Sequence, residues 1–390
     1  MAWGPIRVMR KTVLALKFTI YAIGVFAQIL GENFAARSRA RSLLPAPSKD
    51  SELQNIVIVG ASFAGYHAAR IIATTLPPQA FIPYGPYLNG ASEGRVRWIQ
   101  DRVAEVGRTT VRLVRGSEVI PYAFLVIATG SGANDGLPSR VRADEKSEGL
   151  QQLEVIRTRI RDSKDLVIVG GGAAGVELAA DAKHKYPEKN VTLVHSRDAV
   201  LHRFGPELQA AATKALTSLG VKLILGNRTT DNEIKNGAVN CSGQRPSSAL
   251  VSDLSPDAIS PTGHIRVKPD LQIRDDSLPN VYVCGDVADA GVRSPNARSA
   301  MHQATTVAKN IVQAVTGNTP TETYLPFWAD SVIKLTLGLT RSVSYISDGN
   351  AELLWPTKEK DLALMSAQAW KHMGATPFED QGVPPAMTGL

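Results

Sequence analysis

Cysteine is scarce in this chain, and the two residues present are far apart. Cys241 and Cys284 are separated by 42 residues in a chain of 390, and neither belongs to a C-x-x-C pair. A disulfide-stapled scaffold, a zinc ribbon and a redox-active dithiol are therefore excluded, and a disulfide reductase is disfavoured. We expect both thiols to pack as small buried hydrophobic groups, and we predict no metal site.

Excess charge is also lacking over most of the chain. The formal net charge is +7, and residues 1–41 supply +6 of it through seven basic side chains and one acid. The remaining residues are close to neutral, so the electrostatic basis of a nucleic-acid-binding protein is missing. The charged side chains of the N-terminal segment are Arg7, Arg10, Lys11, Lys17, Arg37, Arg39, Arg41 and Glu32.

The N-terminal segment also holds the longest apolar run. Thr12 to Leu30 is interrupted by Lys17, and its length is close to the ~20 residues that cross a hydrocarbon core. Three interpretations remain open: a membrane anchor, an organelle presequence and a secretory signal. Because Phe18 to Leu30 is apolar on nearly every face, we expect this run to contact lipid rather than the body of the protein. The predicted location is a membrane, with the mitochondrion as one candidate.

The first of two glycine-rich turns lies near residue 60. The β-branched run Asn55 to Val59 leads into GASFAG, and the helical stretch Tyr66 to Leu76 follows. Gly60 permits a tight turn, Ser62 lets the backbone approach a pyrophosphate, and Gly65 allows close packing of helix on strand. Ser62 stands where glycine is usual, so this motif alone is equally compatible with an ordinary turn between strand and helix.

The second turn has the full G-x-G-x-x-G spacing. The strand Leu166 to Val169 precedes Gly170, Gly172 and Gly175, and a helix continues from Val176 to Lys183. The next strand completes a βαβ unit. Two such turns in one chain imply two dinucleotides, most simply a bound flavin and a diffusing nicotinamide.

A carboxylate is missing where NAD-specific folds present one to the ribose. The strand Val191 to Val194 is followed by His195, Ser196 and Arg197. The missing acid and the nearby arginine favour tolerance of the NADP 2′-phosphate. Glu177, just inside the preceding helix, is either a residue near the nicotinamide end of the site or a solvated helix residue.

Two further buried strands end in residues suited to a flavin. Phe124 to Thr129 is followed by Gly130, which lets backbone pass close to a cofactor. Asn280 to Asp289 contains Asp286 at the end of a second apolar strand. Such a carboxylate can bind a ribityl hydroxyl, because ligands lie outside the carboxyl edge of an open α/β sheet.

The motifs VGASFAG, PYAFLVIATG, VIVGGGAAGVELA, VTLVHS, SGQRP and NVYVCGDVAD resemble those of one family. The chain is similar to the apoptosis-inducing-factor-like branch of the pyridine nucleotide flavoproteins, which includes ferroptosis suppressor proteins and type II NADH:quinone oxidoreductases. The similarity runs from about Asn55 to the C-terminal stretch WKHMGATPFED.

The resemblance implies two cofactor sites and a reaction. It implies hydride transfer from NAD(P)H to FAD, then electron delivery to a quinone-like acceptor at a membrane, with the protein supplying orientation and electrostatics. The implied FAD site contains Gly60, Ser62, Gly65, Thr129, Gly130 and Asp286, and the implied NAD(P)H site contains Gly170, Gly172, Gly175 and Glu177.

The chain departs from the family pattern at two places. A strand ending in an acidic residue is expected about 20 residues after the first turn, and it is missing here. Only Ala80 to Tyr84 and Arg95 to Ile99 are left to replace it. Between Gly226 and Cys241, a hairpin and a buried strand of the family are also expected to be absent.

We therefore predict an α/β fold with two Rossmann-like dinucleotide-binding domains, the FAD domain being split by an inserted NAD(P) domain. The predicted divisions are 1–51 (anchor or targeting segment with linker), 52–150 and 255–318 (FAD domain, its first part shortened), 151–254 (NAD(P) domain) and 319–390 (small C-terminal lobe). The predicted function is an FAD-dependent NAD(P)H oxidoreductase. The alternative is a catalytically impaired nucleotide-binding protein with a signalling or scaffold role.

Overall fold

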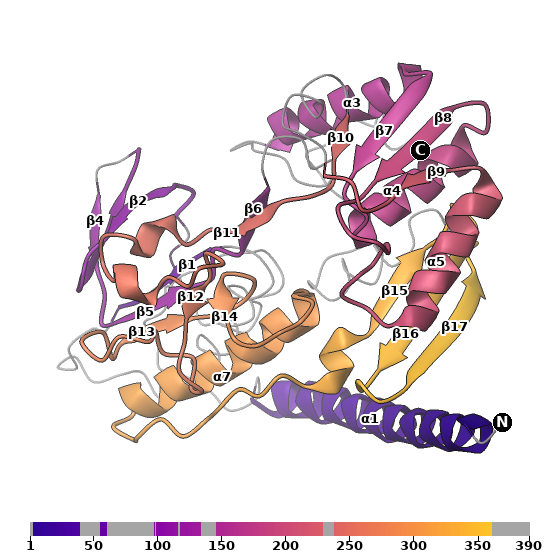
Figure 1. The fold of residues 1–390 in the computed structure, drawn as a ribbon. Coiled ribbons are helices and arrows are strands. Elements are labelled where there is room, and N and C mark those ends of the chain that lie inside the picture. The colour runs from indigo at the N-terminus through magenta and orange to yellow at the C-terminus, as the bar shows by residue number, and fades with distance from the viewer. Residues whose placement is uncertain are drawn as a thin grey trace.

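A computed structural model describes residues 3–39, 55–60, 97, 99–115, 118–133, 146–228 and 238–360 (Figure 1). Along the first helix, side chains are described for residues 6–25. The helices are α1 (Trp3–Arg39), α3 (Lys146–Asp162), α4 (Ala173–Lys185), α5 (Pro206–Leu219) and α7 (Ala297–Val315), with short 3-10 turns η2 (Ala249–Val251), η3 (Pro256–Ala258) and η4 (Trp328–Ser331).

The described strands form two larger parallel sheets, a two-stranded parallel sheet of β12 and β14, and three antiparallel sheets. They are β1 (Ile56–Val59), β2 (Val103–Val106), β3 (Thr110–Leu113), β4 (Val119–Pro121), β5 (Phe124–Ile127), β6 (Ser131–Ala133), β7 (Asp165–Val169), β8 (Asn190–Val194), β9 (Lys222–Ile224), β10 (Val239–Asn240), β11 (Gln244–Pro246), β12 (Ile265–Arg266), β13 (Val281–Val283), β14 (Ala288–Asp289), β15 (Ile333–Thr336), β16 (Arg341–Ser347) and β17 (Glu352–Lys358).

The first parallel sheet has the order β1-β5-β13 and joins segments far apart in the sequence. Strands buried on both faces are continuous apolar runs, and FLVI and VYV are of this kind. Val126 packs toward α7 on one face, whereas Leu125 and Ile127 pack toward the antiparallel sheet β2-β3-β4 on the other. The carboxyl ends of the three strands therefore meet at one edge, beside Gly60, Thr129 and Asp286.

Among the described residues, β1 pairs with β5 alone, so its other edge has no strand beside it. The replacement strand Ala80 to Tyr84 lies outside the described residues. Of Arg95 to Ile99, positions 97 and 99 are described, and neither belongs to a strand. The absence of a strand ending in a ribose-binding acid therefore stays a prediction from the sequence.

The second parallel sheet has the order β10-β7-β8-β9. The predicted strands at 166–169 and 191–194 are present within β7 and β8, and α4 between them completes the βαβ unit. Leu208, Ala212 and Leu216 of α5 pack in the same core as Val176 and Ala179 of α4. One expectation was wrong: the buried strand expected to be missing before Cys241 is present as the short β10, which pairs with β7.

The C-terminal sheet β15-β16-β17 is antiparallel and shares a core with the second parallel sheet. Leu335, Val343 and Tyr345 are buried beside residues of α4 and α5. The ring of Tyr345 lies edge-on to Phe204, and its hydroxyl accepts a hydrogen bond from the backbone nitrogen of Gly205 at 3.1 Å. The C-terminal sheet is thus fixed to the half of the molecule that contains the second parallel sheet.

Helix α1 runs along the C-terminal sheet and contacts the body on one face (Figure 1). Leu14 is fully buried, and the ring of Tyr21 packs on Phe327 and Trp328. The expectation that this run contacts lipid rather than the protein was therefore wrong for that face. Within the described part of the chain, none of the helices combines the length and apolar character needed to span a bilayer.

Candidate functional site

The turn between β7 and α4 forms the more complete dinucleotide cradle. Gly170 has φ +110°, and a Cβ built on it would lie 2.8 Å from the carbonyl carbon of Cys241. A Cβ on Gly175 would lie 1.8 Å from the Gly170 oxygen. Gly172 differs, because a Cβ there would meet nothing within 4 Å. The chain's own packing requires glycine at the first and third positions, and the second position opens onto space.

The open space lies at the N-terminus of α4. Gly172 is the N-cap residue in an extended conformation, and no side chain caps the helix. The first turn also contains no acidic residue that would oppose an anion. Uncapped amide groups and the positive end of the helix dipole favour a diphosphate at such a place. Gly170, Gly172 and Gly175 therefore fit the diphosphate of a dinucleotide, and binding itself stays a prediction.

Two histidines lie beside this cradle. His195 is 7% exposed, and its Nδ1 accepts a hydrogen bond from the Gly171 nitrogen at 3.1 Å. Its Nε2 lies 3.3 Å from Nδ1 of His202. Burial lowers the pKa of both rings, and the nearby charge of Arg197 lowers them further. Because Nδ1 of His195 accepts a hydrogen bond, the neutral ring carries its proton on Nε2. This N–H donates a hydrogen bond to Nδ1 of His202, whose own proton is then on Nε2.

Two acids on α4 point to the C-terminal sheet. Oε1 of Glu177 accepts hydrogen bonds from the Thr336 nitrogen at 3.0 Å and from its hydroxyl at 3.2 Å. Burial raises the pKa of Glu177. Burial and the charge of Glu177 raise the pKa of Asp181 to about 6. Oδ1 of Asp181 is buried without a hydrogen-bond partner among the described residues. Glu177 therefore links the predicted nucleotide site to β15 and is not a solvated helix residue.

The carboxyl edge of the first parallel sheet forms the candidate flavin site. A Cβ on Gly60 would lie 2.2 Å from the Ala128 oxygen, so the turn after β1 closes tightly on β5. The hydroxyl of Thr129 donates to the Ser247 oxygen at 2.8 Å. Gly130 has φ +67° and open space around a Cβ. Ser62 and Gly65, the other predicted members of this site, lie outside the described residues.

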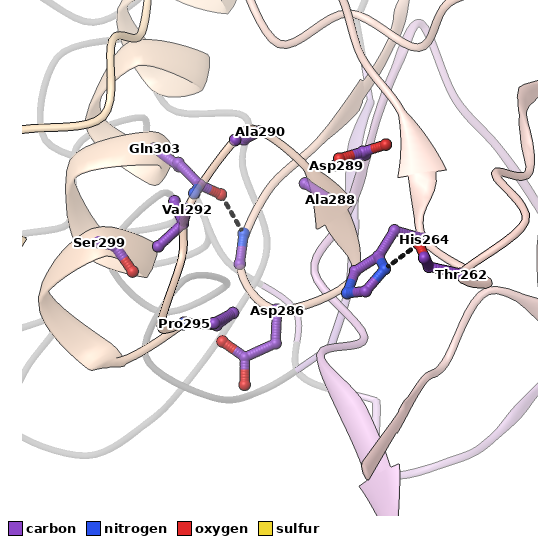
Figure 2. A pocket seen from close by; sticks show the side chains of 12 residues that line it. Thr262, His264, Asp286, Ala288, Asp289, Ala290, Val292, Pro295, Ser299 and Gln303 are labelled. Carbon is purple, nitrogen blue, oxygen red and sulfur yellow. Dashed lines mark hydrogen bonds between the residues drawn. The ribbon is translucent and has the colours of Figure 1, made fainter. Parts of the chain in front are cut away.

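Asp286 lies on the rim of a cavity of about 120 Å³ at the same edge (Figure 2). The Ser131 hydroxyl donates to Oδ2 of Asp286 at 3.3 Å. Behind Asp286, the Gly285 nitrogen donates to Oε1 of Gln303 on α7 at 2.7 Å (Figure 2). These bonds hold the turn after β13 in place. An anchored carboxylate at the end of a parallel strand suits a ligand hydroxyl.

The comparisons with known proteins agree with two cofactor sites. A family model described as pyridine nucleotide-disulphide oxidoreductase matches residues 88–308. The chain belongs to this family. Ferroptosis suppressor protein 1 of Xenopus tropicalis is 28% identical over 371 aligned positions, which cover 83% of this chain and 97% of that protein. The Homo sapiens protein of the same name is 30% identical over 290 positions, which cover 68% and 75%.

Solved structures share the fold. The sulfide:quinone oxidoreductase of Aquifex aeolicus has a TM-score of 0.63 at 13% identity, over 84% of this chain and 93% of that one. An engineered water-forming NADPH oxidase, bound to NADPH, has a TM-score of 0.55 at 18% identity, over 75% of each chain. The chain is therefore a flavoprotein related to the ferroptosis suppressor proteins, an FAD-dependent NAD(P)H oxidoreductase.

Several residues that shape these sites were not found from the sequence. His202 contacts His195, and Gln303 on α7 contacts Gly285. No sequence motif links either residue to its glycine-containing turn. Thr336 likewise reaches Glu177 across 159 positions of sequence. Asp181 alone carried a local signal, because an acid four residues after Glu177 lies on the same face of the helix.

Gly172→Leu is expected to block the nucleotide cradle without unfolding the protein. A Cβ at this position has no heavy atom within 4 Å, so the side chain enters the space above the helix N-terminus. We predict at least a tenfold loss of NAD(P)H affinity by fluorescence titration, with the free energy of unfolding changed by less than about 1 kcal/mol. Gly175→Ala is the contrasting variant, because its methyl group collides with the Gly170 oxygen and must lower stability. Unchanged nucleotide affinity in Gly172→Leu would remove the assignment.

Asp181→Asn is expected to change how stability depends on pH. A carboxyl group whose folded-state pKa is raised contributes stability below its unfolded-state value near 3.8, and this contribution is lost as pH rises through about 6. Asparagine does not ionise, so the variant keeps that contribution. We predict unfolding free energies within about 0.5 kcal/mol of each other at pH 4 and a variant more stable by about 1–2 kcal/mol at pH 7.5, discounted for partial exposure. Denaturant titration at both pH values measures this, and a variant less stable at pH 7.5 contradicts it.

Proposed function

We propose that this oxidoreductase passes electrons from NAD(P)H through FAD to a quinone-like acceptor at a membrane surface. The proposal rests on one observation: the chain has two candidate cofactor sites, and neither of its cysteine thiols can take part in electron transfer. Cys241 and Cys284 are both free, and burial raises the pKa of each to about 12. Neither thiol can act as a thiolate at neutral pH. The electrons must therefore leave on an external acceptor.

The protein's contribution is to bind and orient the two cofactors. The turn from Gly170 to Gly175 and the N-terminus of α4 hold the diphosphate of NAD(P)H. Asp286 and the backbone at Thr129 and Gly130 hold FAD. When bound, FAD supplies a two-electron carrier between the nicotinamide and the acceptor. The relatives named ferroptosis suppressor protein and the fold shared with a sulfide:quinone oxidoreductase support an acceptor of the quinone class.

The region after β8 suits a nucleotide with a 2′-phosphate. His195 occupies the position of the usual carboxylate, and Ser196 and Arg197 are exposed beside it. Asp198 is the nearest acid in sequence, and its Oδ1 is directed at Gly226. No carboxylate of this stretch therefore replaces the missing one. In the engineered oxidase bound to NADPH, an aspartate is removed and two arginines are introduced, which is the same direction of electrostatic change.

Ser196→Glu is expected to penalise NADPH and spare NADH. The new carboxylate faces the 2′-phosphate, and like charges in contact reduce affinity. We predict a dissociation constant for NADPH at least tenfold higher by fluorescence titration, with the constant for NADH changed less than threefold. Ser196→Gln has the same size without the charge and should leave both constants near those of the wild type. A wild-type protein that strongly prefers NADH, or equal penalties for both nucleotides, would contradict this reasoning.

A second candidate function rests on the predicted shortening of the first lobe. The alignment with the Xenopus tropicalis protein has 371 positions, and 83% of 390 is about 324 residues, so about 47 positions have no residue here. In addition, β1 has one described partner strand. A lobe without its neighbouring strand and ribose-binding acid holds FAD weakly. The alternative is thus an impaired flavoprotein that binds a nucleotide and acts in signalling or as a scaffold.

The deciding experiment measures quinone reduction with and without added FAD. We expect the purified chain to lose FAD on gel filtration, and to oxidise NADPH with a soluble ubiquinone analogue once FAD is present in excess. Gly172→Leu should lower this rate at least tenfold. Tightly held stoichiometric FAD would contradict the weak site. No quinone reduction at saturating FAD, with nucleotide binding intact, would favour the alternative function.

A further inference from the structure

Helix α1 carries a row of exposed apolar side chains on the face turned away from the body. The outer stripe consists of Ile6, Met9, Val13, Leu16, Ile20 and Ile23, which are 45–62% exposed. Their spacing alternates between three and four residues, so they form one continuous row along the helix. The stripe is roughly 26 Å long at 1.5 Å per residue. Monomeric soluble proteins rarely leave such a row uncovered.

The opposite face of α1 is tied to the body by ion pairs. Arg7 and Lys11 pair with Glu207 on α5, at 2.6 and 2.7 Å. Lys17 pairs with Asp348, which follows β16, at 2.7 Å. Together with buried Leu14, these contacts hold the helix alongside the second parallel sheet and the C-terminal sheet. The outer stripe must therefore point outward, in a fixed relation to the rest of the molecule.

The charge of the segment favours a lipid surface over a second copy of the chain. Residues 1–31 hold Arg7, Arg10, Lys11 and Lys17 and no acid. Arg7, Lys11 and Lys17 pair with acids of the body, which leaves Arg10 as the cation of residues 6–25 with no ion pair to a described residue. Two copies paired along the stripe would lack the acids that flank the seam of a stable coiled coil. An anionic lipid surface attracts Arg10, which is exposed next to Met9 of the stripe, and Lys17, whose side chain stays 48% exposed next to Leu16.

The two threonine hydroxyls beside the stripe are already hydrogen-bonded. The hydroxyls of Thr12 and Thr19 donate to the carbonyl oxygens of Val8 and Ala15, each at 3.0 Å. A hydroxyl bonded to its own helix can enter an apolar environment without losing a partner. Between residues 6 and 25, the exposed face of α1 is thus compatible with contact to acyl chains.

We propose that α1 lies in the plane of an anionic lipid surface, with the outer stripe at the level where headgroups meet acyl chains and its opposite face still docked on the body. The proposal rests on the membrane part of the proposed function and specifies its geometry: the contact is made by one face of one helix, and the body stays on one side. The C-terminal sheet, which α1 follows, is then held next to the bilayer.

The first test adds the full-length protein to preformed vesicles of phosphatidylcholine with phosphatidylserine. We expect the wild type to cosediment, and Leu16→Glu/Ile20→Glu to bind at least tenfold less, because two carboxylates enter the apolar level. Val155→Glu is the matched control, since Val155 is also apolar and 68% exposed but lies on α3. It should bind as the wild type does. If the glutamate variant is unfolded by circular dichroism, Leu16→Ser/Ile20→Ser replaces it.

The possible outcomes separate this inference from the proposed function. If the wild type binds and the stripe variants bind equally well, the inference is wrong and membrane action stands through another surface. If the wild type binds no vesicle, both the inference and the proposed membrane action are wrong. The proposed quinone reduction is then tested only by the assay in solution. If ultracentrifugation shows a dimer that the stripe variants abolish, the occupant is a second copy and the inference is wrong.

The second test asks whether α1 stays docked when lipid is bound. Lys17→Cys/Asp348→Cys replaces an ion pair by two thiols that a short bis-maleimide can bridge. We expect an intramolecular cross-link in solution and, at the same yield, on vesicles. The wild type controls for its own thiols, which are largely buried. A cross-link lost on vesicles would contradict the docked geometry, because a helix inserted across the bilayer would separate position 17 from position 348.

Discussion

Close backbone contact at two turns is the constraint on which the structure depends. After β1, the chain turns so tightly that a Cβ on Gly60 would overlap the carbonyl of Ala128. After β7, the same holds between Gly175 and the oxygen of Gly170. The second contact brings α4 onto its sheet, and both leave the carboxyl edges of the strands free. Both candidate cofactor sites lie at those edges, because ligands of open α/β sheets bind outside the strand ends.

The two sites differ in how completely the described residues form them. The nucleotide cradle has its turn, its uncapped helix and a histidine pair in the place of the usual acid. The flavin edge has Asp286, held by Ser131 and by the bond between Gly285 and Gln303. Its first turn is described only as far as Gly60, and β1 pairs on one side. An electron path through this protein therefore depends on how firmly the first lobe holds FAD.

Local sequence patterns were sufficient to predict the strands and helices that build the sheets. They could not predict contacts between residues that are far apart in the sequence. Gly-rich turns and apolar runs predicted β7, α4 and β8 because their signal lies within about thirty residues. The apolar strands predicted within 124–129 and 280–289 are also present, as β5 and β13. The partner of Glu177 was not predictable, because Thr336 reaches it only when the C-terminal sheet packs on α4. The environment of α1 was misjudged for the same reason: its cations find acids on α5 and after β16.

The central claim is that electrons pass from NAD(P)H to a flavin and then leave the protein, with no internal disulfide as an intermediate store. Anaerobic titration of the FAD-loaded protein with NADPH tests it most directly, with the flavin absorbance as the readout. We predict that one equivalent of NADPH reduces each bound FAD, and that addition of a quinone restores the oxidised spectrum. Uptake of a second equivalent by a dithiol, or a flavin that NADPH and NADH both fail to reduce, would contradict it.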